Sequence, residues 1–261
     1  MLSLGIGATG MLAQQMHVDV ISNNIANMTT TGFKRQRPEF QDLIYQNIIR
    51  PGSSSSDQNT LVPSGIQLGL GVKPGSVYRI DQQGSIEITD NELDLAINGR
   101  GYFQIEMPSG ETGYTRAGNF GRNAEGLIVT AQGYTVQPAI TIPDDALSIT
   151  INASGEVLAK LPEQVEMQNL GQIQLATFVN NAGLEAIGDN LFLETESSGT
   201  ARIGTPQEEG VGALIQGSRE NSNVDVVQEI TSMITAQRAY EMNSQVIQTS
   251  DEMMASLSQI R

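Results

Sequence analysis

Residues 222–258 read SNVDVVQEITSMITAQRAYEMNSQVIQTSDEMMASLS, a stretch that contains neither glycine nor proline. Because these two residues are the strongest helix breakers, the stretch predicts one helix about 55 Å long. Ser222 is a good N-cap residue, and Asp225 follows it as an acidic residue does in a capping box. Residues at alternating steps of three and four form a narrow, mainly apolar stripe: Val226, Ile230, Met233, Gln237, Tyr240, Ser244, Ile247, Asp251 and Met254.

The opposite end of the chain, from about Leu4 to Ala26, repeats this spacing. A helix of that length measures about 35 Å. Asn27, the Thr29–Thr31 run and Gly32 are expected to end it, because β-branched residues and glycine are poor helix formers. A stripe this narrow needs a partner helix, so the two ends are expected to pair with each other; the alternative is that each packs separately on the central region. The stripe is Leu4, Gly7, Met11, Gln14, Val18, Ile21 and Ile25.

The central part, from about Val77 to Ile215, alternates apolar and polar residues in the way that is typical of half-buried strands. Turn sequences such as Pro108-Ser109-Gly110 and Ser154-Gly155 divide it at short intervals. Connections this short join antiparallel strands, since a parallel crossover needs about a dozen residues or more. The alternating apolar positions are Phe103, Ile105, Met107, Leu127, Val129, Val136, Leu147, Ile149, Ile151, Val157, Ala159, Ile173, Leu175, Leu191 and Leu193.

These patterns predict an α+β fold. The N- and C-terminal helices pair as a coiled-coil-like domain, and an antiparallel β-rich middle domain is inserted between them. The predicted domains are residues 1–45 with 216–261, an extended hairpin-like segment over 46–76, and the β-rich domain over 77–215.

The extended segment has two interpretations. Its glycines and the serines of Pro51–Ser56 are typical of a flexible linker. Ile66, Leu68, Leu70 and Val72, however, alternate with Gln67, Gly69 and Gly71, which is a strand pattern. The segment is therefore predicted to be a long hairpin with Pro51–Ser56 at its tip.

The composition argues against several classes of function. The chain carries 14 Lys and Arg against 29 Asp and Glu, a formal net charge of −15, whereas a nucleic-acid binder needs clustered cations. Cysteine is absent, so the chain has neither disulfides nor thiolate chemistry. No run is apolar over the ~18 residues of a membrane span, and no secretory signal sequence is visible. The one basic cluster, expected to be a solvated turn, is Lys34, Arg35 and Arg37, with Glu39 and Asp42 close behind.

Three features resemble chemical sites but have simpler explanations. Gly5–Gly10 spells a dinucleotide-binding fingerprint, but no strand can precede it. Asp90, Glu92 and Asp94 alternate as in a calcium loop, yet the required Gly and Glu are missing, which favours an acidic face on an edge strand. His17 is the only histidine and is expected to be a helix-surface residue. The sequence thus predicts no catalytic, cofactor-binding or metal-binding residue and no cofactor.

Both ends of the chain resemble the signatures of flagellar rod and hook proteins. Ser22-Asn23-Asn24-Ile25-Ala26-Asn27 followed by Thr31-Gly32-Phe33-Lys34 is similar to the N-terminal signature. Ser222–Val227 and Gln237–Ser244 are similar to the C-terminal signature. Asn98–Phe103, Tyr114–Arg116 and Gly118–Phe120 extend the resemblance over nearly the whole chain, and with the overall length they resemble the rod more than the longer hook protein. The motif positions are Asn23, Asn24, Asn27, Gly32, Phe33, Lys34, Gln237, Arg238 and Tyr240.

The resemblance implies a structural protein of the distal rod and no enzyme. In this family the terminal helices pair and assemble around a central export channel, while the β-rich part faces outward. The polymer is a rigid hollow drive shaft that transmits torque. Alternatives are a proximal rod protein of the same family and, in a different class, a soluble β-rich enzyme or carbohydrate-binding module.

The resemblance also implies partners and a location. The partners are other copies of the chain, other rod proteins, hook subunits and the surrounding ring proteins, with no nucleic acid and no membrane insertion. The expected location is the basal body, where the rod runs through the periplasm and the outer-membrane rings. Such a subunit is exported without a cleaved signal peptide.

Two sets of side chains are then expected to act in assembly. The apolar stripes carry contacts between helices, and neutral polar residues line the channel so that export substrates pass without sticking. An ordinary solvated helix face is the alternative for the second set. The lining candidates are Gln14, Gln15, Asn243, Gln245 and Gln248, with Asn23, Asn24, Ser244 and Thr249 beside them.

Overall fold

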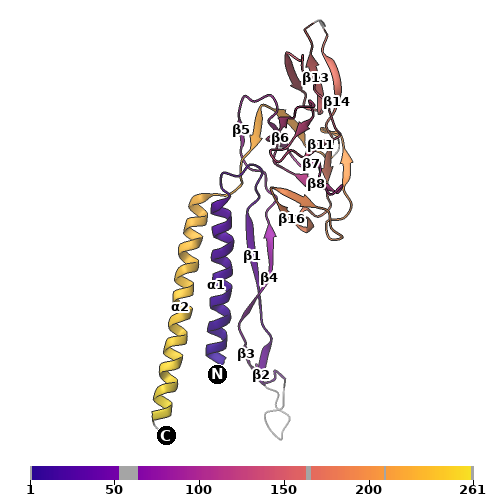
Figure 1. Ribbon diagram of the computed structural model, residues 1–261. Coiled ribbons are helices and arrows are strands. Elements are labelled where there is room, and N and C mark those ends of the chain that lie inside the picture. Colours follow the sequence, from indigo (N-terminus) through magenta and orange to yellow (C-terminus); the bar gives the residue numbers. More distant parts are fainter. Residues whose placement is uncertain (1, 53–63, 163–165, 209, 260–261) are drawn as a thin grey trace. The chain divides into compact units, whose positions relative to one another are not determined.

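The computed structural model describes residues 2–52, 64–162, 166–208 and 210–259 (Figure 1). The chain divides into two units. The helical unit comprises Met1–Ile25, Gln36–Tyr78 and Asp225–Arg261, and the β unit comprises Ala26–Arg35 and Arg79–Val224. The predicted α+β class is confirmed, while the finer division at residues 46 and 77 stays a prediction.

The two terminal helices are α1, Leu2–Ala26, and α2, Val226–Gln259. The predicted N-cap of the second helix was wrong. Asp225, not Ser222, is the cap, since its Oδ1 accepts the backbone N–H groups of Val227 at 2.9 Å and Gln228 at 3.2 Å. The helix begins later than predicted because Asn223 uses its own side chain to bind distant backbone, including the Arg35 N–H at 2.6 Å.

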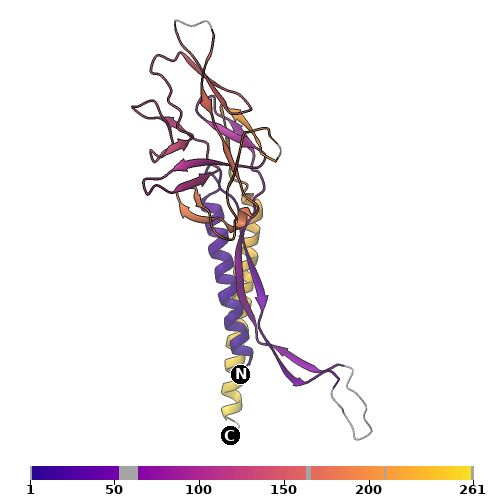
Figure 2. The same cartoon turned by 90° about the vertical axis from the view of Figure 1, so that its right-hand side faces the viewer.

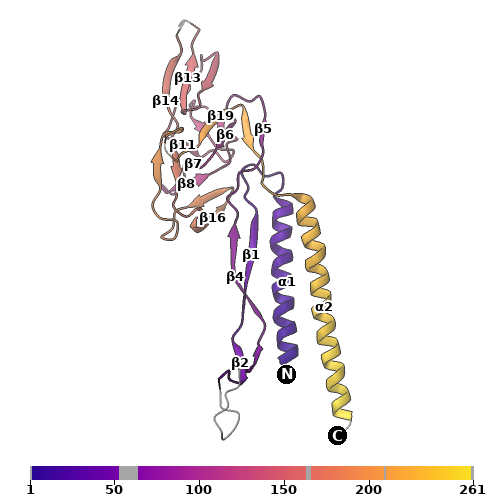
Figure 3. The ribbon, with the colours of Figure 1, turned by 180° about the vertical axis from the view of Figure 1, so that it is seen from behind.

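The helices α1 and α2 lie side by side and run in opposite directions (Figures 1 and 3). Asn24 Nδ2 donates to Glu229 Oε2 across the pair at 3.1 Å. Glycines allow close approach: a Cβ on Gly10 would lie 2.9 Å from Asn243 Nδ2, and one on Gly7 would lie 2.8 Å from Ile247 Cγ1. The predicted pairing of the terminal helices is therefore confirmed, in the register that places Asn24 by Glu229 and Gly10 by Asn243.

The helical unit also contains a two-stranded ribbon (Figure 2). Strand β1, Gln36–Asp42, pairs with β4, Val72–Arg79. Beyond them β2, Tyr45–Ile49, pairs with β3, Ile66–Gly69, in the antiparallel register Tyr45 to Gly69. The strand pattern predicted over Ile66–Val72 is interrupted at Leu70 and Gly71, the second of which has φ +120°. Of the predicted tip, residues 53–56 lie outside the described residues.

The β unit is antiparallel throughout the part of the chain that the structure describes, as predicted. Its largest sheet has the order β16-β17-β8-β7-β11-β10-β9, and β15 with β18 joins it at β7. These strands are β7 Tyr102–Glu106, β8 Thr112–Thr115, β9 Gly121–Arg122, β10 Ile128–Val129, β11 Thr135–Gln137, β15 Leu175–Thr177, β16 Glu185–Gly188, β17 Leu191–Leu193 and β18 Arg202–Gly204.

The described residues of the unit form three further, smaller sheets. Their orders are β12-β13-β14, β19-β6 and β20-β5. Glycine-containing turns connect the hairpins where the sequence predicted them: the Gly110 N–H donates to Met107 O and the Gly155 N–H to Asn152 O. The strands are β5 Ile86–Ile88, β6 Leu95–Asn98, β12 Ser148–Ile151, β13 Glu156–Lys160, β14 Gln168–Gln172, β19 Ala213–Gln216 and β20 Ser218–Glu220.

The core of the β unit consists of the inward residues of these strands. Phe103, Ile105 and Leu175 are fully buried there, and Phe103 meets Phe120 edge to face. Most of the alternating positions predicted from the sequence belong to this cluster, which makes the β unit a packed domain with its own core.

Candidate functional site: assembly surfaces and a buried polar junction

The helical pair leaves large apolar side chains exposed. On α2, Ile230 keeps 47% and Tyr240 keeps 43% of its surface open to solvent. Apolar side chains on so many faces of a two-helix pair are typical of a surface that another protein covers. The exposed apolar residues of the two helices are Leu2, Ile6, Leu12, Val227, Ile230, Ile234, Tyr240, Met242, Val246, Met253 and Met254.

Some residues of the predicted apolar stripes are buried or half-buried, and others are exposed to solvent. On α1, Ile21 is buried, and Leu4, Met11, Val18 and Ile25 are half-buried. On α2, Val226, Met233 and Ile247 are half-buried, whereas Ile230 and Tyr240 face solvent. The role of these stripes in assembly stays a prediction, and the exposed members are those that are free to meet a second molecule.

The side of α2 with the deepest burial is a different one. Glu229, Ala236 and Ser250 are buried, and Asn243 is half-buried against α1. These four positions recur every seven residues, which is the repeat of a coiled-coil seam. A search for apolar residues missed this seam because its members are small or polar. The seven-residue spacing, together with Gly7 and Gly10 on α1, is the signal that could have found it.

Asn24 is the central polar residue of the seam. Besides Glu229, its Nδ2 donates to Gln36 O at 2.8 Å, and its Oδ1 accepts the Gln36 N–H at 2.9 Å. One buried side chain thus joins α1, α2 and the start of β1. A buried amide with its hydrogen bonds satisfied in this way fixes the register of a helix pair, because a slip would leave it unpaired in the interior.

The lining candidates occupy two environments. Gln15, Gln245 and Gln248 are exposed, whereas Gln14 and Asn243 are half-buried. Of the residues beside them, Asn23 and Thr249 are exposed, Ser244 is half-buried and Asn24 is buried. The lining role of the whole set stays a prediction.

Among the motif residues, Lys34 corrects the prediction of a solvated basic turn. It is 3% exposed, and its Nζ lies 2.7 Å from Glu220 Oε1. Arg116 Nε lies 2.7 Å from Glu220 Oε2, so one buried carboxylate binds two buried cations. Arg37 does behave as predicted, since its pair with Glu39 is exposed on both sides.

The charges around Glu220 support one another. Burial on its own would raise the pKa of the Glu220 carboxyl, but Arg116 and Lys34, through their charges and hydrogen bonds, hold that pKa below its usual range. Burial also lowers the pKa of the Lys34 ammonium from its ordinary value, although the contact with Glu220 opposes this. The 2.7 Å contacts of Glu220 with Lys34 and Arg116 are charge-assisted hydrogen bonds, which are shorter and stronger than neutral ones.

The remaining motif residues are spread over both units. Gly32 is buried with φ +70°, and a Cβ there would lie 2.8 Å from the Ala117 nitrogen, so the position requires glycine. Phe33 and Asn27 are half-buried, and Asn27 Oδ1 accepts the Thr30 hydroxyl at 3.1 Å. Gln237 and Arg238 are exposed on α2, near Tyr240.

Two further predictions were wrong in detail. Asp94 is not on an exposed strand face; it is buried and accepts hydrogen bonds from Thr89 Oγ1 at 2.6 Å and Asn91 Nδ2 at 2.9 Å, which shapes the loop after β5. His17 is half-buried, not a surface residue, and its ring meets Phe40 edge to face. Burial lowers the pKa of His17, although the charge of Glu229 opposes the shift.

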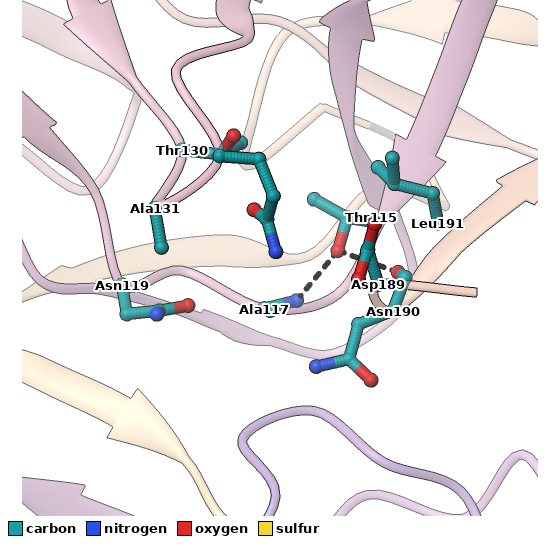
Figure 4. Close-up of a pocket in the computed structure, with 9 residues that line it drawn as sticks. Thr115, Ala117, Asn119, Thr130, Ala131, Asp189, Asn190 and Leu191 are labelled. Carbon is teal, nitrogen blue, oxygen red and sulfur yellow. Dashed lines mark hydrogen bonds between the residues drawn. The ribbon is translucent and has the colours of Figure 1, made fainter.

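A small pocket lies in the β unit between Thr115, Asn119, Thr130 and Asn190 (Figure 4). The Thr115 hydroxyl donates to Asn190 O at 2.8 Å and accepts the Ala117 N–H at 3.1 Å, so its polar groups bind one another. Its volume of about 50 Å³ is far below the roughly 300–1,000 Å³ of ligand sites. Within the described ranges no group of three or more His, Cys, Asp or Glu could hold a metal, and no helix is long and apolar enough to cross a membrane.

Comparisons with known proteins match three parts of the chain to family models. Residues 4–34 match "Flagella basal body rod protein", residues 96–159 match "Flagellar hook protein FlgE/F/G D1 domain", and residues 215–260 match "Flagellar basal body rod FlgEFG protein C-terminal".

Individual proteins are similar to this chain over nearly all of its length. The flagellar basal-body rod protein FlgG of Caulobacter vibrioides is 61% identical over 100% of both chains. The FlgG protein of Agrobacterium fabrum is 50% identical over 99% of this chain and 98% of its own. The flagellar hook-basal body complex protein FlhP of Bacillus subtilis is 32% identical over 95% of this chain and 94% of its own.

Proposed function

This chain belongs to the FlgG family of flagellar basal-body rod proteins, and we propose that it is a structural subunit of the distal rod of the bacterial flagellum. In that role it polymerises with copies of itself into a rigid hollow shaft. The shaft transmits torque and encloses the export channel. The chain acts by assembly and has no catalytic role.

The observation that carries this proposal is the apolar surface that the helical pair leaves open. Val227, Ile230 and Ile234 follow one another at helical spacing on α2 and are all exposed. Burying such side chains against a neighbouring copy removes apolar surface from water, which is the main driving force of protein association. A shaft also requires the copies to meet through different surfaces, since such contacts extend without closing.

The ribbon is the second element of the proposal. Ile44 is 81% exposed, and Ile48, Ile66, Leu68, Val77 and Tyr78 are exposed as well. A two-stranded ribbon is marginal in water when nothing covers it. In the polymer we assign it the role of a brace that packs on a neighbouring subunit and resists the sliding of subunits past one another.

The remaining roles follow from membership of the family. The polar residues Gln14, Gln15, Asn243, Gln245 and Gln248 line the channel, and the β unit faces outward. The partners are other rod proteins, hook subunits and the surrounding ring proteins. The subunit leaves the cell by the flagellar export route without a cleaved signal peptide and is located in the basal body.

Electron microscopy of the concentrated, purified protein tests the proposal against a β-rich enzyme or carbohydrate-binding module. A rod subunit is expected to form straight, hollow filaments as the concentration rises, and sedimentation velocity should show species that grow with concentration. A protein that stays monomeric at every soluble concentration would contradict the proposal. Loss of distal rods, with proximal rods intact, in cells lacking the gene would separate it from a proximal rod protein.

A further inference from the structure

Three irregular segments carry the chain into and out of the β unit. Residues 31–35 follow α1, residues 80–85 follow β4, and residues 221–224 precede α2. None of them belongs to a helix or strand, so their backbone groups need other partners. Within the β unit they find these partners in one another and in the adjoining end of β20: the Ile80 N–H donates to Arg35 O at 2.8 Å, the Asn221 N–H to Ser85 O at 2.8 Å, and the Gly32 N–H to Glu220 O at 2.8 Å.

Glu220 supplies the charged part of this junction. Its Oε1 accepts from Lys34 Nζ at 2.7 Å and from the Gly84 N–H at 2.9 Å, and thus binds two of the three segments. Lys34 Nζ also donates to Gln82 O at 2.9 Å. The second carboxylate oxygen binds Arg116, whose guanidinium donates to Gly101 O at 2.7 Å and Gly99 O at 2.6 Å. The carboxylate therefore ties the segments to the turn before β7.

Asn223 supplies the neutral part. Its Oδ1 accepts the Arg35 N–H at 2.6 Å, and its Nδ2 donates to Ile80 O at 3.0 Å and Gln82 O at 2.8 Å. One amide thus makes three bonds to the other two segments. The segment leaving α1 is thus joined to Glu220 by the backbone bond at Gly32 and the ion pair at Lys34, and to the adjoining segment that enters α2 by this amide.

We propose that these three segments form a mechanical clamp, which shields the sheets of the β unit from tension applied to the two terminal helices. Tension on α1 reaches the β unit through residues 31–35, and tension on α2 reaches it through residues 221–224. Since these segments, together with Glu220 at the end of β20, are bonded directly to each other, the force passes between them and does not enter the strands behind β20. The bonds share the load because they lie within a few residues on each side, so they must break together.

The clamp goes beyond the role in the rod, because it is a property of a single chain. In a polymer whose subunits are held by their helices, it would keep each β unit folded while torque is transmitted. That consequence rests on the proposed function, but the clamp itself can be tested on the isolated protein, so failure of one is distinguishable from failure of the other.

The test is to pull the full-length protein from its N- and C-termini in an optical trap. The antiparallel helices open first, layer by layer, at low force. The clamp is then expected to resist until a single high-force event releases the chain between Lys34 and Glu220, with a gain in length of about 650 Å. Asn223→Ala is expected to lower the force of that event and to leave the length gain unchanged.

Arg219→Met is the matched control. It lies in the same strand as Glu220, but its pair with Glu87 at 3.1 Å is exposed, so this variant should release at the wild-type force. Lys34→Met provides a second variant should Asn223→Ala fail to fold. The clamp would be refuted by wild-type protein whose sheets unfold in small steps without a high-force event, or by clamp variants that release at the wild-type force.

Discussion

Glu220 shows at the scale of a single residue how charge is used in the interior of this protein. It is 1% exposed and contacts two cations that are nearly as buried. Buried ion pairs add little net stability compared with apolar residues, but removing one partner leaves a charge without compensation. The junction therefore depends on having all of its members present.

Lys34→Met should expose this dependence. The variant leaves Glu220 and the Gln82 carbonyl without their shared donor, and we expect the free energy of unfolding to fall by about 3–5 kcal/mol. Urea denaturation followed by circular dichroism measures the change. Arg37→Met removes an exposed pair three residues further along the chain, in β1, and should cost less than about 1 kcal/mol; equal losses in the two variants would show that the buried contact is not special.

The acid side of the stability curve gives an independent measurement of Glu220. Because Arg116 and Lys34 outweigh the effect of burial, the folded-state pKa of Glu220 lies below its ordinary value of 4.5. A carboxyl with a depressed pKa binds protons more readily in the unfolded chain. Its contribution to stability is complete above the ordinary value and is lost as the pH falls through the lower folded value.

The free energy of unfolding should therefore depend on pH more steeply in the wild-type protein than in Glu220→Gln. Unfolding in urea between about pH 7 and about pH 3.5 should show that the free energy of unfolding falls more steeply in the wild type. At position 220 the wild-type carboxylate binds a proton in this range, whereas the amide of the variant does not. The variant itself is expected to be less stable at neutral pH, where two buried cations face an amide. Parallel curves below pH 4.5 would mean that the carboxyl titrates alike in both states.

At the scale of the helices, the close contact between α1 and α2 depends on glycine. A side chain at Gly10 would collide with Asn243, whereas Gly5 has open space around its Cβ position. Both positions are helical, so leucine would favour the helix by a similar amount at each, about 0.8 kcal/mol. Comparing leucine at these two sites therefore distinguishes the effect of helix propensity from the effect of packing between the helices.

Gly5→Leu and Gly10→Leu make a matched pair. We expect Gly5→Leu to raise the temperature at which the helical circular dichroism signal is lost, and Gly10→Leu to lower it, because overpacking a close contact costs typically about 1–3 kcal/mol. If both variants shift the transition in the same direction, the helices are not packed through Gly10 in solution.

Ile230, on the exposed face of α2, is expected to affect assembly and not folding. Ile230 is exposed in the single subunit, so Ile230→Asp should leave the thermal unfolding of the β unit unchanged. In the polymer the charge would be buried at an apolar contact, at a cost of several kcal/mol. Sedimentation and electron microscopy should show folded monomers and no filaments. Thr231→Asp places the same charge on the next exposed residue; filaments formed equally well by both variants would remove Ile230 from the assembly surface.

The sequence predicted the helices better than it predicted their contacts. Long uninterrupted periodicity was sufficient for α1 and α2, and alternation with glycine turns was sufficient for strands such as β7 and β12. The N-cap of α2 is Asp225 and not the predicted Ser222, because the side chain of Asn223 is hydrogen-bonded to backbone groups far away in the sequence, which keeps this residue outside the helix. The buried partner of Lys34 lies near the other end of the chain, and no local pattern reveals it.

The helix seam was missed for a related reason. The apolar stripe of α2 and its buried seam lie on different faces of the same helix. Apolar spacing in the sequence predicts the stripe but not the seam. Glu229, Ala236, Asn243 and Ser250 carry little hydrophobicity; Asn243 lies against Gly10 of α1, and Glu229 accepts a hydrogen bond from Asn24 of α1. The apolar side chains that this arrangement leaves outside are the reason to expect a second molecule.

For the whole molecule, the ribbon of β2 and β3 is the element whose removal tests stiffness apart from assembly. It is joined to the rest of the helical unit through β1 and β4, and the Leu43 N–H donates to Gly71 O at 2.9 Å where the two pairs meet. Deleting residues 48–70 would remove the outer ribbon and leave Ile44–Asn47 as a loop that closes β1 onto β4. Loops of this length are common between paired strands.

We expect this deletion to leave export and polymerisation largely intact, since the helices proposed to carry assembly are untouched. Bending a tube requires neighbouring subunits to slide past one another, and an apolar ribbon packed across their boundary opposes sliding because each displacement exposes its side chains to water. Without the ribbon the filaments should curve, which electron micrographs measure as a shorter persistence length. A variant with the full ribbon but with Ile48 and Leu68 changed to Thr, which keeps the strands and removes exposed apolar groups, should bend to an intermediate degree. Deletion filaments as straight as the parent would mean that stiffness arises in the helices and that this segment only connects β1 to β4.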